Sequence, residues 1–316
     1  MPDLAKRIAD LPTSRRQLFE RLLKEKIGAP KLQPVAPKAE LMFDTGSSSA
    51  DDTKAGYRRF YNGVSEQLNN SDFGDFSFFL NYGYVADRNP QYAQVQLPAH
   101  YLNKNSVRLA LELIDDCEIT GRRVLDVGCG RGGTISVIQK FFAPQSITGV
   151  DISSVAISFC HKTHRHSQIR FMEADAEALP FRERAFDVVT NVESSHSYPH
   201  IETFYTEVSR VLVPGGYFLY TDVLPIARMN ECEKLLQRAG FSVERLRDIT
   251  TNVVLSCDQI AETRTGAFAQ AQNPGTLDEF LALPGSDVYE EMRQRQCVYH
   301  MFKLKKTEVE GDGQRG

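Results

Sequence analysis

The segment that most constrains the fold is Val124-Leu-Asp-Val-Gly-Cys-Gly-Arg-Gly-Gly133. A mostly apolar run ends at Val127, glycines follow at 128, 130, 132 and 133, and Thr134 to Phe142 has a helix-like pattern. Glycines allow a tight turn and a close approach of ligand to backbone, and the first N–H groups of a helix point at that ligand. The segment therefore predicts a strand, a turn and a helix around a nucleotide-like cofactor. Its glycines also satisfy the dinucleotide pattern G-x-G-x-x-G, so this segment alone leaves the cofactor open.

Strand-like and helix-like segments alternate downstream of Gly121, which predicts an α/β fold with a doubly wound, mostly parallel sheet. The predicted strands are Arg123–Val127, Ser146–Val150, Ile169–Glu173, Phe186–Asn191, Gly216–Thr221, Phe241–Asp248 and Cys297–Lys305. The predicted helices are Thr134–Phe142, Ser154–His164, Ile201–Val211, Asn230–Ala239 and Asp287–Arg295.

Four regions are predicted along the chain. Residues 1–54 form an N-terminal amphipathic helix and a flexible linker rich in Pro, Gly and Ser. Residues 55–115 form an aromatic-rich, helical lid region. Residues 116–306 form the cofactor-binding core, with a helical insertion at about 250–284, and residues 307–316 form a disordered tail.

Composition and charge narrow the possible partners. A net charge of −4 and the lack of a basic stripe argue against nucleic acid as a partner. No stretch of about 18 apolar residues is present, so no membrane span is predicted, and a cytoplasmic location is expected. The six cysteines are scattered without a C-x-x-C pair, which predicts neither a zinc site nor a disulfide framework. The tract His161-Lys-Thr-His164-Arg-His166 falls at a predicted helix end, where cations need no further function, and no metal is predicted.

The acidic residue after the second predicted strand fits either cofactor, and the segments from the third predicted strand onward distinguish between the two. Asp151 follows the glycines by about 20 residues, where a carboxylate binds ribose hydroxyls in either kind of site. Asp175 follows the third strand, where it can accept a hydrogen bond from an adenine amino group. Pro214-Gly-Gly216 then precedes the fifth strand, and no Tyr-x-x-x-Lys arrangement suited to hydride transfer is found.

Together these segments resemble the class I S-adenosylmethionine-dependent methyltransferases over roughly residues 121–222. The resemblance implies a Rossmann-like, seven-stranded sheet whose last strand is antiparallel and inserted between the fifth and sixth. It also implies S-adenosylmethionine as the cofactor and S-adenosylhomocysteine as its product. The cofactor-binding residues that it implies are Tyr82, Asp126, Gly128, Gly130, Asp151, Ile152, Asp175, Ala176 and Asn191.

The predicted catalytic residues follow the fourth and fifth strands. In an open parallel sheet, reacting groups gather at the carboxyl ends of the strands, so His196 and Asp222 are expected to approach each other. A histidine suits removal of a hydroxyl proton, and a carboxylate on its other ring nitrogen fixes the tautomer. Asp222 is the first choice for this carboxylate and Glu193 the second. The alternatives are a structural histidine before Pro199 and a Glu193 that only binds the loop backbone.

Two further segments resemble particular branches of the family. Asn81-Tyr-Gly-Tyr84 is similar to a lid segment of sugar, sterol, tocopherol and mycobacterial lipid methyltransferases, in which an aromatic residue touches the cofactor; the alternative for Tyr82 is a core aromatic turn. The segments Arg247–Val254 and Leu283–Met292 resemble methyltransferases of polyketide and peptide pathways, including O-methyltransferases embedded in polyketide synthases.

The resemblance thus implies O-methylation of a polyketide-like hydroxyl, on a small molecule or on a carrier protein, with assembly-line synthase modules as possible partners. Two alternatives stay open: C-methylation of the sterol or tocopherol type, and a non-catalytic scaffold that binds S-adenosylmethionine.

Overall fold

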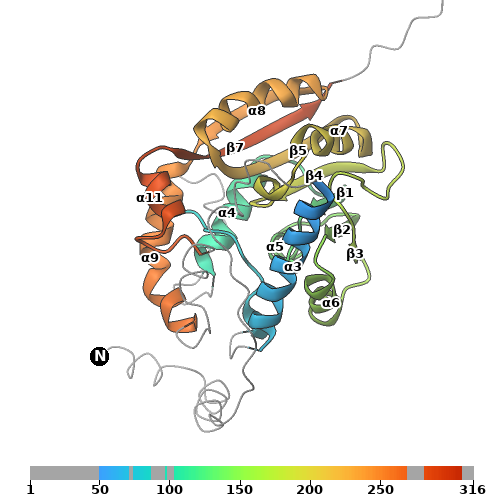
Figure 1. Cartoon of the computed structure of the whole chain (residues 1–316). Helices are drawn as coiled ribbons and strands as arrows, with labels where there is room; N and C mark the ends of the chain where they lie inside the picture. The colour runs from blue at the N-terminus through green and yellow to red at the C-terminus, as the bar shows by residue number, and fades with distance from the viewer. Residues whose placement is uncertain (1–49, 71–73, 87–96, 98–102, 269–280, 308–316) are drawn as a thin grey trace, which may run out of the picture. The chain divides into compact units, whose positions relative to one another are not determined.

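A single mixed sheet of seven strands organises the residues that the structure describes (Figure 1), with the strand order β3-β2-β1-β4-β5-β7-β6. The computed structural model describes residues 50–70, 74–86, 97, 103–268 and 281–307. All of them belong to the compact unit Ala36–Gly316. The predicted N-terminal helix, most of the predicted linker and the predicted tail beyond Thr307 lie outside the described residues.

The strands agree closely with the predicted segments. They are β1 (Arg123–Val127), β2 (Ser146–Asp151), β3 (Ile169–Glu173), β4 (Phe186–Val192), β5 (Leu212–Pro225), β6 (Phe241–Asp248) and β7 (Cys297–Lys306). The first five pair in parallel. β7 runs antiparallel to both β5 and β6 and lies between them. The seven-stranded sheet with an inserted antiparallel last strand, which the family resemblance implied, is therefore confirmed.

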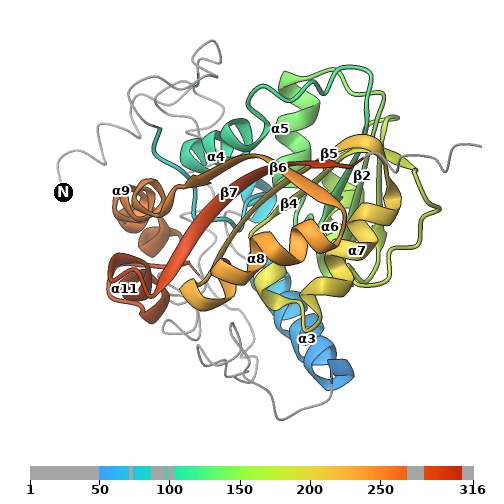
Figure 2. The same ribbon diagram turned by 90° about the horizontal axis from the view of Figure 1, so that it is seen from above.

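Helices cover both faces of the sheet. They are α3 (Ala50–Asn69), α4 (Lys104–Ile114), α5 (Gly133–Phe141), α6 (Ser154–Thr163), α7 (Ile201–Val211), α8 (Ile226–Arg238), α9 (Thr250–Phe268) and α11 (Asp287–Arg293), with short 3-10 turns η2 (Gly74–Phe76) and η3 (Ser195–Ser197). Figure 2 shows α4 and α5 on one face and α7 and α8 on the other.

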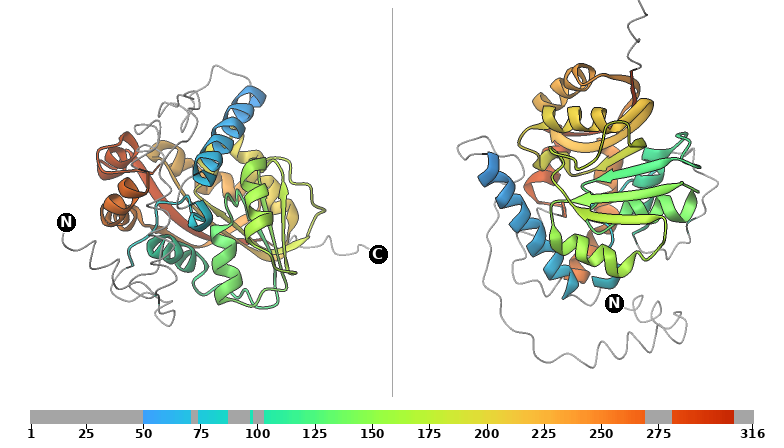
Figure 3. Two further views of the ribbon diagram at one scale, coloured as in Figure 1. Left: turned by 90° about the horizontal axis from the view of Figure 1, so that it is seen from below. Right: turned by 90° about the vertical axis from the view of Figure 1, so that its right-hand side faces the viewer.

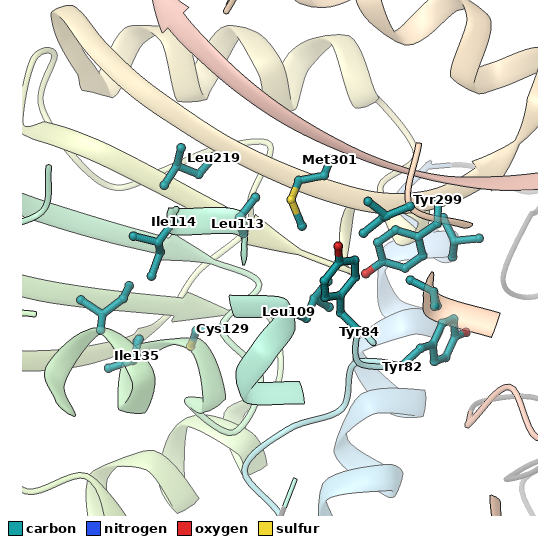
Figure 4. Packing of buried hydrophobic residues seen from close by; sticks show 14 of the residues in the cluster. Tyr82, Tyr84, Leu109, Leu113, Ile114, Cys129, Ile135, Leu219, Tyr299 and Met301 are labelled. Atoms are coloured by element: carbon teal, nitrogen blue, oxygen red, sulfur yellow. The ribbon is translucent and has the colours of Figure 1, made fainter. Parts of the chain in front are cut away.

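The two faces have separate hydrophobic cores, because successive strand residues point to opposite sides of a sheet. On β1, Val124 packs in the core beneath α4, α5 and α6, whereas Leu125 packs in the core beneath α7 and α8. Figure 4 shows part of the first core, in which Leu109 and Met301 pack near a group of tyrosines. Both residues are buried. The burial of both faces leaves the carboxyl edge of the parallel strands as the place for a site.

The fifth strand begins earlier than predicted. β5 starts at Leu212, and Pro214-Gly-Gly216, predicted as a turn before the strand, lies inside it. Three additional residues interrupt its pairing with β4, since Phe186 pairs with Leu212 but Val188 pairs with Tyr217. A bulge of this kind accommodates the Pro-Gly-Gly segment without ending the strand.

Two helices also begin earlier than the sequence predicted. α8 begins at Ile226 instead of Asn230, and α3 begins at Ala50, inside the stretch predicted as linker. α3 lies along the carboxyl edge of the sheet (Figure 3), and α9, within the predicted insertion, packs against α11 and β7. The rest of the predicted insertion, residues 269–280, lies outside the described residues.

Candidate active site

The glycine segment forms the tight turn that its sequence predicts. Gly128 has a φ of +69°, and an added Cβ would lie 2.2 Å from the Ser194 hydroxyl oxygen. At Gly133, the first residue of α5, an added Cβ would lie 2.5 Å from the Phe79 ring. The loop therefore needs glycine for both backbone conformation and space.

A cavity opens beside this loop at the carboxyl edge of β1, β2 and β4. It encloses about 1170 Å³, counted out to its opening to solvent. Nine of the residues that sequence reasoning assigned to the site line it: Tyr82, Gly128, Gly130, Asp151, Ile152, Asp175, Ala176, Glu193 and His196. The structure thus brings together residues that are more than 100 positions apart in the sequence.

Asp151 at the end of β2 is held by backbone donors. Its Oδ2 accepts a hydrogen bond from Gly130 N at 2.8 Å, and its Oδ1 accepts one from Ser153 N at 2.8 Å. Burial raises the pKa of Asp151, and these backbone hydrogen bonds oppose that rise. The carboxylate is thus fixed between the glycine loop and the start of α6, at the carboxyl end of β2.

Asp175, the predicted adenine acceptor, has a cationic neighbour that sequence reasoning missed. Lys54 of α3 lies 2.7 Å from Asp175 Oδ2 and 2.6 Å from Glu177 Oε2. Burial lowers the pKa of Lys54, but the hydrogen bonds and charges of these two carboxylates outweigh it and leave the pKa raised. Asp175 Oδ1 accepts from Glu177 N at 2.9 Å. The helix α3 is therefore joined to this side of the cavity by an ion pair.

Asp126 and Asn191 do not line the cavity, although direct cofactor contact was predicted for both. Asp126 accepts a hydrogen bond from the Thr190 hydroxyl at 2.6 Å, and burial raises its pKa to about 7. Asn191 Nδ2 donates to the Val127 carbonyl at 2.9 Å and to Ser194 Oγ at 2.7 Å. Both side chains instead join β1 to β4, and Asn191 binds the residue just before the glycine loop.

His196 and Asp222 form a buried pair. His196 Nδ1 lies 2.9 Å from Asp222 Oδ1, with His196 6% exposed and Asp222 0% exposed. Asp222 Oδ2 also accepts from the Ser195 hydroxyl at 2.6 Å and from His196 N at 3.0 Å. Burial alone would lower the pKa of His196, but the charge and hydrogen bond of Asp222, together with the charge of Glu193, leave it raised. Asp222 does not line the cavity, whereas His196 does.

Glu193 makes different contacts from those of Asp222. Its Oε1 accepts from Tyr82 N at 2.9 Å and from the Tyr299 hydroxyl of β7. Burial raises the pKa of Glu193 to about 7, against the lowering effect of these hydrogen bonds. Asp222, and not Glu193, is thus the carboxylate hydrogen-bonded to the ring of His196. Figure 4 shows the tyrosines at 82, 84 and 299 gathered at this end of the core.

Within the histidine tract, His164 makes structural contacts. His164 Nε2 lies 2.8 Å from the Arg131 carbonyl oxygen, and its ring packs edge-on against Phe78. His161 and His166 are exposed. Within the described ranges, no group of three His, Cys, Asp or Glu side chains could hold a metal ion. All six cysteines are buried as free thiols.

Comparisons with known proteins agree with this site. Residues 125–220 match the family described as "Methyltransferase domain". The chain is 37% identical to the fatty-acid O-methyltransferase of Mycolicibacterium smegmatis, over 71% of this chain and 81% of that protein. It is 31% identical to the phthiotriol/phenolphthiotriol dimycocerosates methyltransferase of Mycobacterium tuberculosis, over 83% of this chain and 95% of that protein.

A solved structure supports the fold alone. The [4+2]-cyclase SpnF superimposes with a TM-score of 0.63 at 20% identity, over 81% of this chain and 97% of that chain. The sheet order, the glycine loop and the two carboxylates at the strand ends are those of a class I methyltransferase fold. With relatives this similar over most of their length, the chain belongs to the S-adenosylmethionine-dependent methyltransferases. It is an enzyme, and S-adenosylmethionine is its cofactor.

No helix in the described part of the chain is both long enough and apolar enough to cross a membrane.

Proposed function

We propose that this protein is an O-methyltransferase that methylates a hydroxyl group of a polyketide-like or lipid acceptor. The observation that carries the proposal is the buried pair of His196 and Asp222, in which only His196 reaches the cavity. Asp222 binds Nδ1 and leaves Nε2 as the nitrogen available to an acceptor.

The residues present fit the cofactor. The cradle at Gly128 would be filled by a single Cβ, and Asp151 and Asp175 present carboxylates at the ends of β2 and β3. We propose that Asp151 binds the ribose hydroxyls and that Asp175 accepts from the adenine amino group, with Ile152, Ala176 and Tyr82 in contact. S-adenosylmethionine, when bound, supplies a methyl group already activated by its sulfonium.

The chain's own residues then align the acceptor and remove its proton. The acceptor oxygen bonds to the methyl carbon, its proton passes to His196 Nε2, and the electron pair of the broken carbon–sulfur bond stays on sulfur. Asp222 orients the imidazole and stabilises the imidazolium that forms.

Charge favours a neutral acceptor over a carboxylate. The relative from Mycolicibacterium smegmatis is named for fatty acids, whose carboxylates need no base. In this cavity, however, the buried Asp222 behind His196, and Glu193 in its ionised form, would repel a carboxylate. Of the cations that line the described cavity, Lys54 is paired with two carboxylates and Arg131 is bound to backbone carbonyls. A neutral hydroxyl acceptor is not repelled by these carboxylates, and it needs His196 to remove its proton.

The test uses labelled cofactor with matched hydroxy, carboxylic and keto acceptors, each free and carrier-bound. We expect label on the oxygen of a hydroxy acceptor, with His196→Ala turning over about 10²–10⁴-fold more slowly at saturating cofactor. His166→Ala, at an exposed histidine, is the matched control.

Near-normal turnover of His196→Ala would contradict base catalysis and would favour a carboxylate acceptor. Label on carbon would establish C-methylation of the sterol or tocopherol type instead. A carrier-bound acceptor, synthase modules as partners and a cytoplasmic location stay predictions from the sequence.

A further inference from the structure

The helix α3 carries a side chain to the reactive nitrogen of the proposed base. α3 is held across the cavity at three points along its length. Lys54 pairs with Asp175, Asn62 Oδ1 accepts from the Ser153 hydroxyl at 2.7 Å, and the Ser65 carbonyl accepts from Arg131. The side chain of Tyr61, on the same helix, is therefore presented to the cavity from a fixed position.

Tyr61 lies near Nε2 of His196, the ring nitrogen that Asp222 does not bind. The Tyr61 hydroxyl oxygen lies 3.5 Å from His196 Nε2 and 2.9 Å from Ser197 Oγ. Tyr61, Ser197 and His196 all line the cavity. The phenol and the imidazole thus present two polar atoms, from two distant parts of the chain, to the same space.

This spacing suits a single oxygen atom bound by both groups. A hydroxyl oxygen forms hydrogen bonds at about 2.8 Å. A point at about 2.8 Å from both Tyr61 Oη and His196 Nε2 lies about 2.2 Å from the line that joins them, because the two atoms are 3.5 Å apart. An acceptor hydroxyl placed there could contact both atoms without moving either.

The protonation of Tyr61 also suits this role. Burial raises the pKa of Tyr61 and outweighs the lowering effect of its hydrogen bond to Ser197, so the phenol keeps its proton at neutral pH. A neutral phenol donates one hydrogen bond and accepts others, so it can donate to an acceptor oxygen while accepting from Ser197.

We propose that Tyr61 is a positioning residue for the acceptor: its hydroxyl donates to the acceptor oxygen whose proton faces His196 Nε2. This rests on the proposed O-methylation of a hydroxyl. Two hydrogen bonds fix the acceptor oxygen more firmly than one. A residue of this kind contributes to the rate of methyl transfer because it orients the reacting oxygen toward the methyl carbon.

Binding to the enzyme saturated with S-adenosylhomocysteine, where no transfer occurs, tests the proposal. The probes are a β-hydroxyacyl thioester and the acyl thioester of the same length without the hydroxyl. In Tyr61→Phe we expect the Kd of the hydroxy probe to rise about fivefold to tenfold, the loss of one neutral hydrogen bond. The Kd values of the deoxy probe and of S-adenosylhomocysteine should stay unchanged.

Tyr289→Phe is the matched control, because its hydroxyl is bonded to Asp258 and does not line the cavity. It should change neither Kd. Equal weakening of both probes in Tyr61→Phe would assign Tyr61 to packing alone and overturn the proposal, as would no change in either.

The test of Tyr61 can fail independently of the test of His196 as the base. If His196→Ala keeps its turnover, base catalysis fails whatever the two probes show. If His196→Ala loses turnover and Tyr61→Phe binds both probes normally, only the role of Tyr61 fails. In steady state, a positioning role predicts that Tyr61→Phe raises the acceptor KM while the cofactor KM is unchanged.

Discussion

Replacing Asp222 by asparagine tests the orientation of His196 most directly. The carboxylate is completely buried and accepts four hydrogen bonds, two at each oxygen. Oδ2 binds Ser195 Oγ and His196 N, and Oδ1 binds His196 Nδ1 and Val223 N. An asparagine has one carbonyl oxygen, so its NH2 group must face a backbone N–H at either position.

The expected effects follow from that geometry. One buried backbone donor loses its acceptor, which lowers the free energy of unfolding by about 1–3 kcal/mol. If the NH2 group faces His196 Nδ1, it donates to that nitrogen and leaves the proton on Nε2, the wrong tautomer for a base. We expect kcat to fall about 10³–10⁴-fold, the scale of an amide replacement in a comparable histidine–carboxylate pair.

The pH dependence adds a second readout. Asp222 raises the pKa of His196 by charge and hydrogen bonding against the lowering effect of burial. Without that charge the pKa of His196 falls, so the acidic limb of the kcat profile moves to lower pH.

The assay is transfer of labelled methyl at saturating cofactor across a pH series, with S-adenosylhomocysteine binding as the control. Because Asp222 does not line the cavity, the Kd of S-adenosylhomocysteine should stay as in the wild type. A variant that kept a tenth or more of the wild-type kcat, with an unmoved acidic limb, would refute the reasoning.

Three further predictions concern the groups around the pair. Glu193 has a pKa of about 7 in the folded protein against 4.5 as its ordinary value. Between those values the folded state holds a proton that the unfolded state has lost, so the free energy of unfolding falls as pH rises, by up to about 1.4 kcal/mol per pH unit. Urea unfolding of Glu193→Gln should show a shallower fall over this range, and a slope equal to that of the wild type would contradict the prediction. Asp151→Ala should weaken binding of S-adenosylhomocysteine by about tenfold to a hundredfold, the worth of hydrogen bonds to a charged group, measured by calorimetry; an unchanged Kd would remove Asp151 from the ribose site. Gly128→Ala should lower Tm and abolish measurable cofactor binding, because its Cβ would meet Ser194 and Tyr198 at a φ of +69°; Gly121→Ala, with a φ of +70° but open space around it, is the control for backbone strain alone.

The core of the fold was predictable because its signals are local. Each parallel strand is a short apolar run next to a helical pattern, and β1, β3 and β6 have the predicted limits. β5 was placed too late because Pro214-Gly-Gly216 has the composition of a turn, and only pairing with β4 shows that it is a bulge. The position of β7 came from the family resemblance, since no local pattern tells which neighbours a strand takes.

The site was predictable where chemistry and strand ends coincide. Asp151, Asp175 and His196 follow strands and line the cavity. Asp126 and Asn191 lie one residue before the ends of β1 and β4. Their side chains therefore bond within the sheet, and the sequence does not give the exact residue at which each strand ends.

The residues that were missed come from other elements. Lys54 and Tyr61 belong to α3, and Tyr299 belongs to β7. Their separation from the rest of the site in sequence hides their contacts, which arise only when the helix crosses the strand ends and the last strand enters the sheet. An aromatic residue in a helix and a tyrosine in a strand have no local pattern that indicates such contacts.

The place of β7 in the sheet has a consequence for synthesis of the protein on the ribosome. Elements emerge in chain order, so β6 leaves the ribosome before β7, its neighbour in the described sheet, exists. β7 then enters between β5 and β6, and it brings the Tyr299 hydroxyl to Glu193. The nascent chain therefore exposes an unpaired strand, and Glu193 lacks its contact with Tyr299, until residues 297–306 have emerged. The capacity to transfer methyl groups should therefore arise abruptly, once β7 has emerged, because one strand both closes the described sheet and brings Tyr299 to Glu193 in the pocket lining.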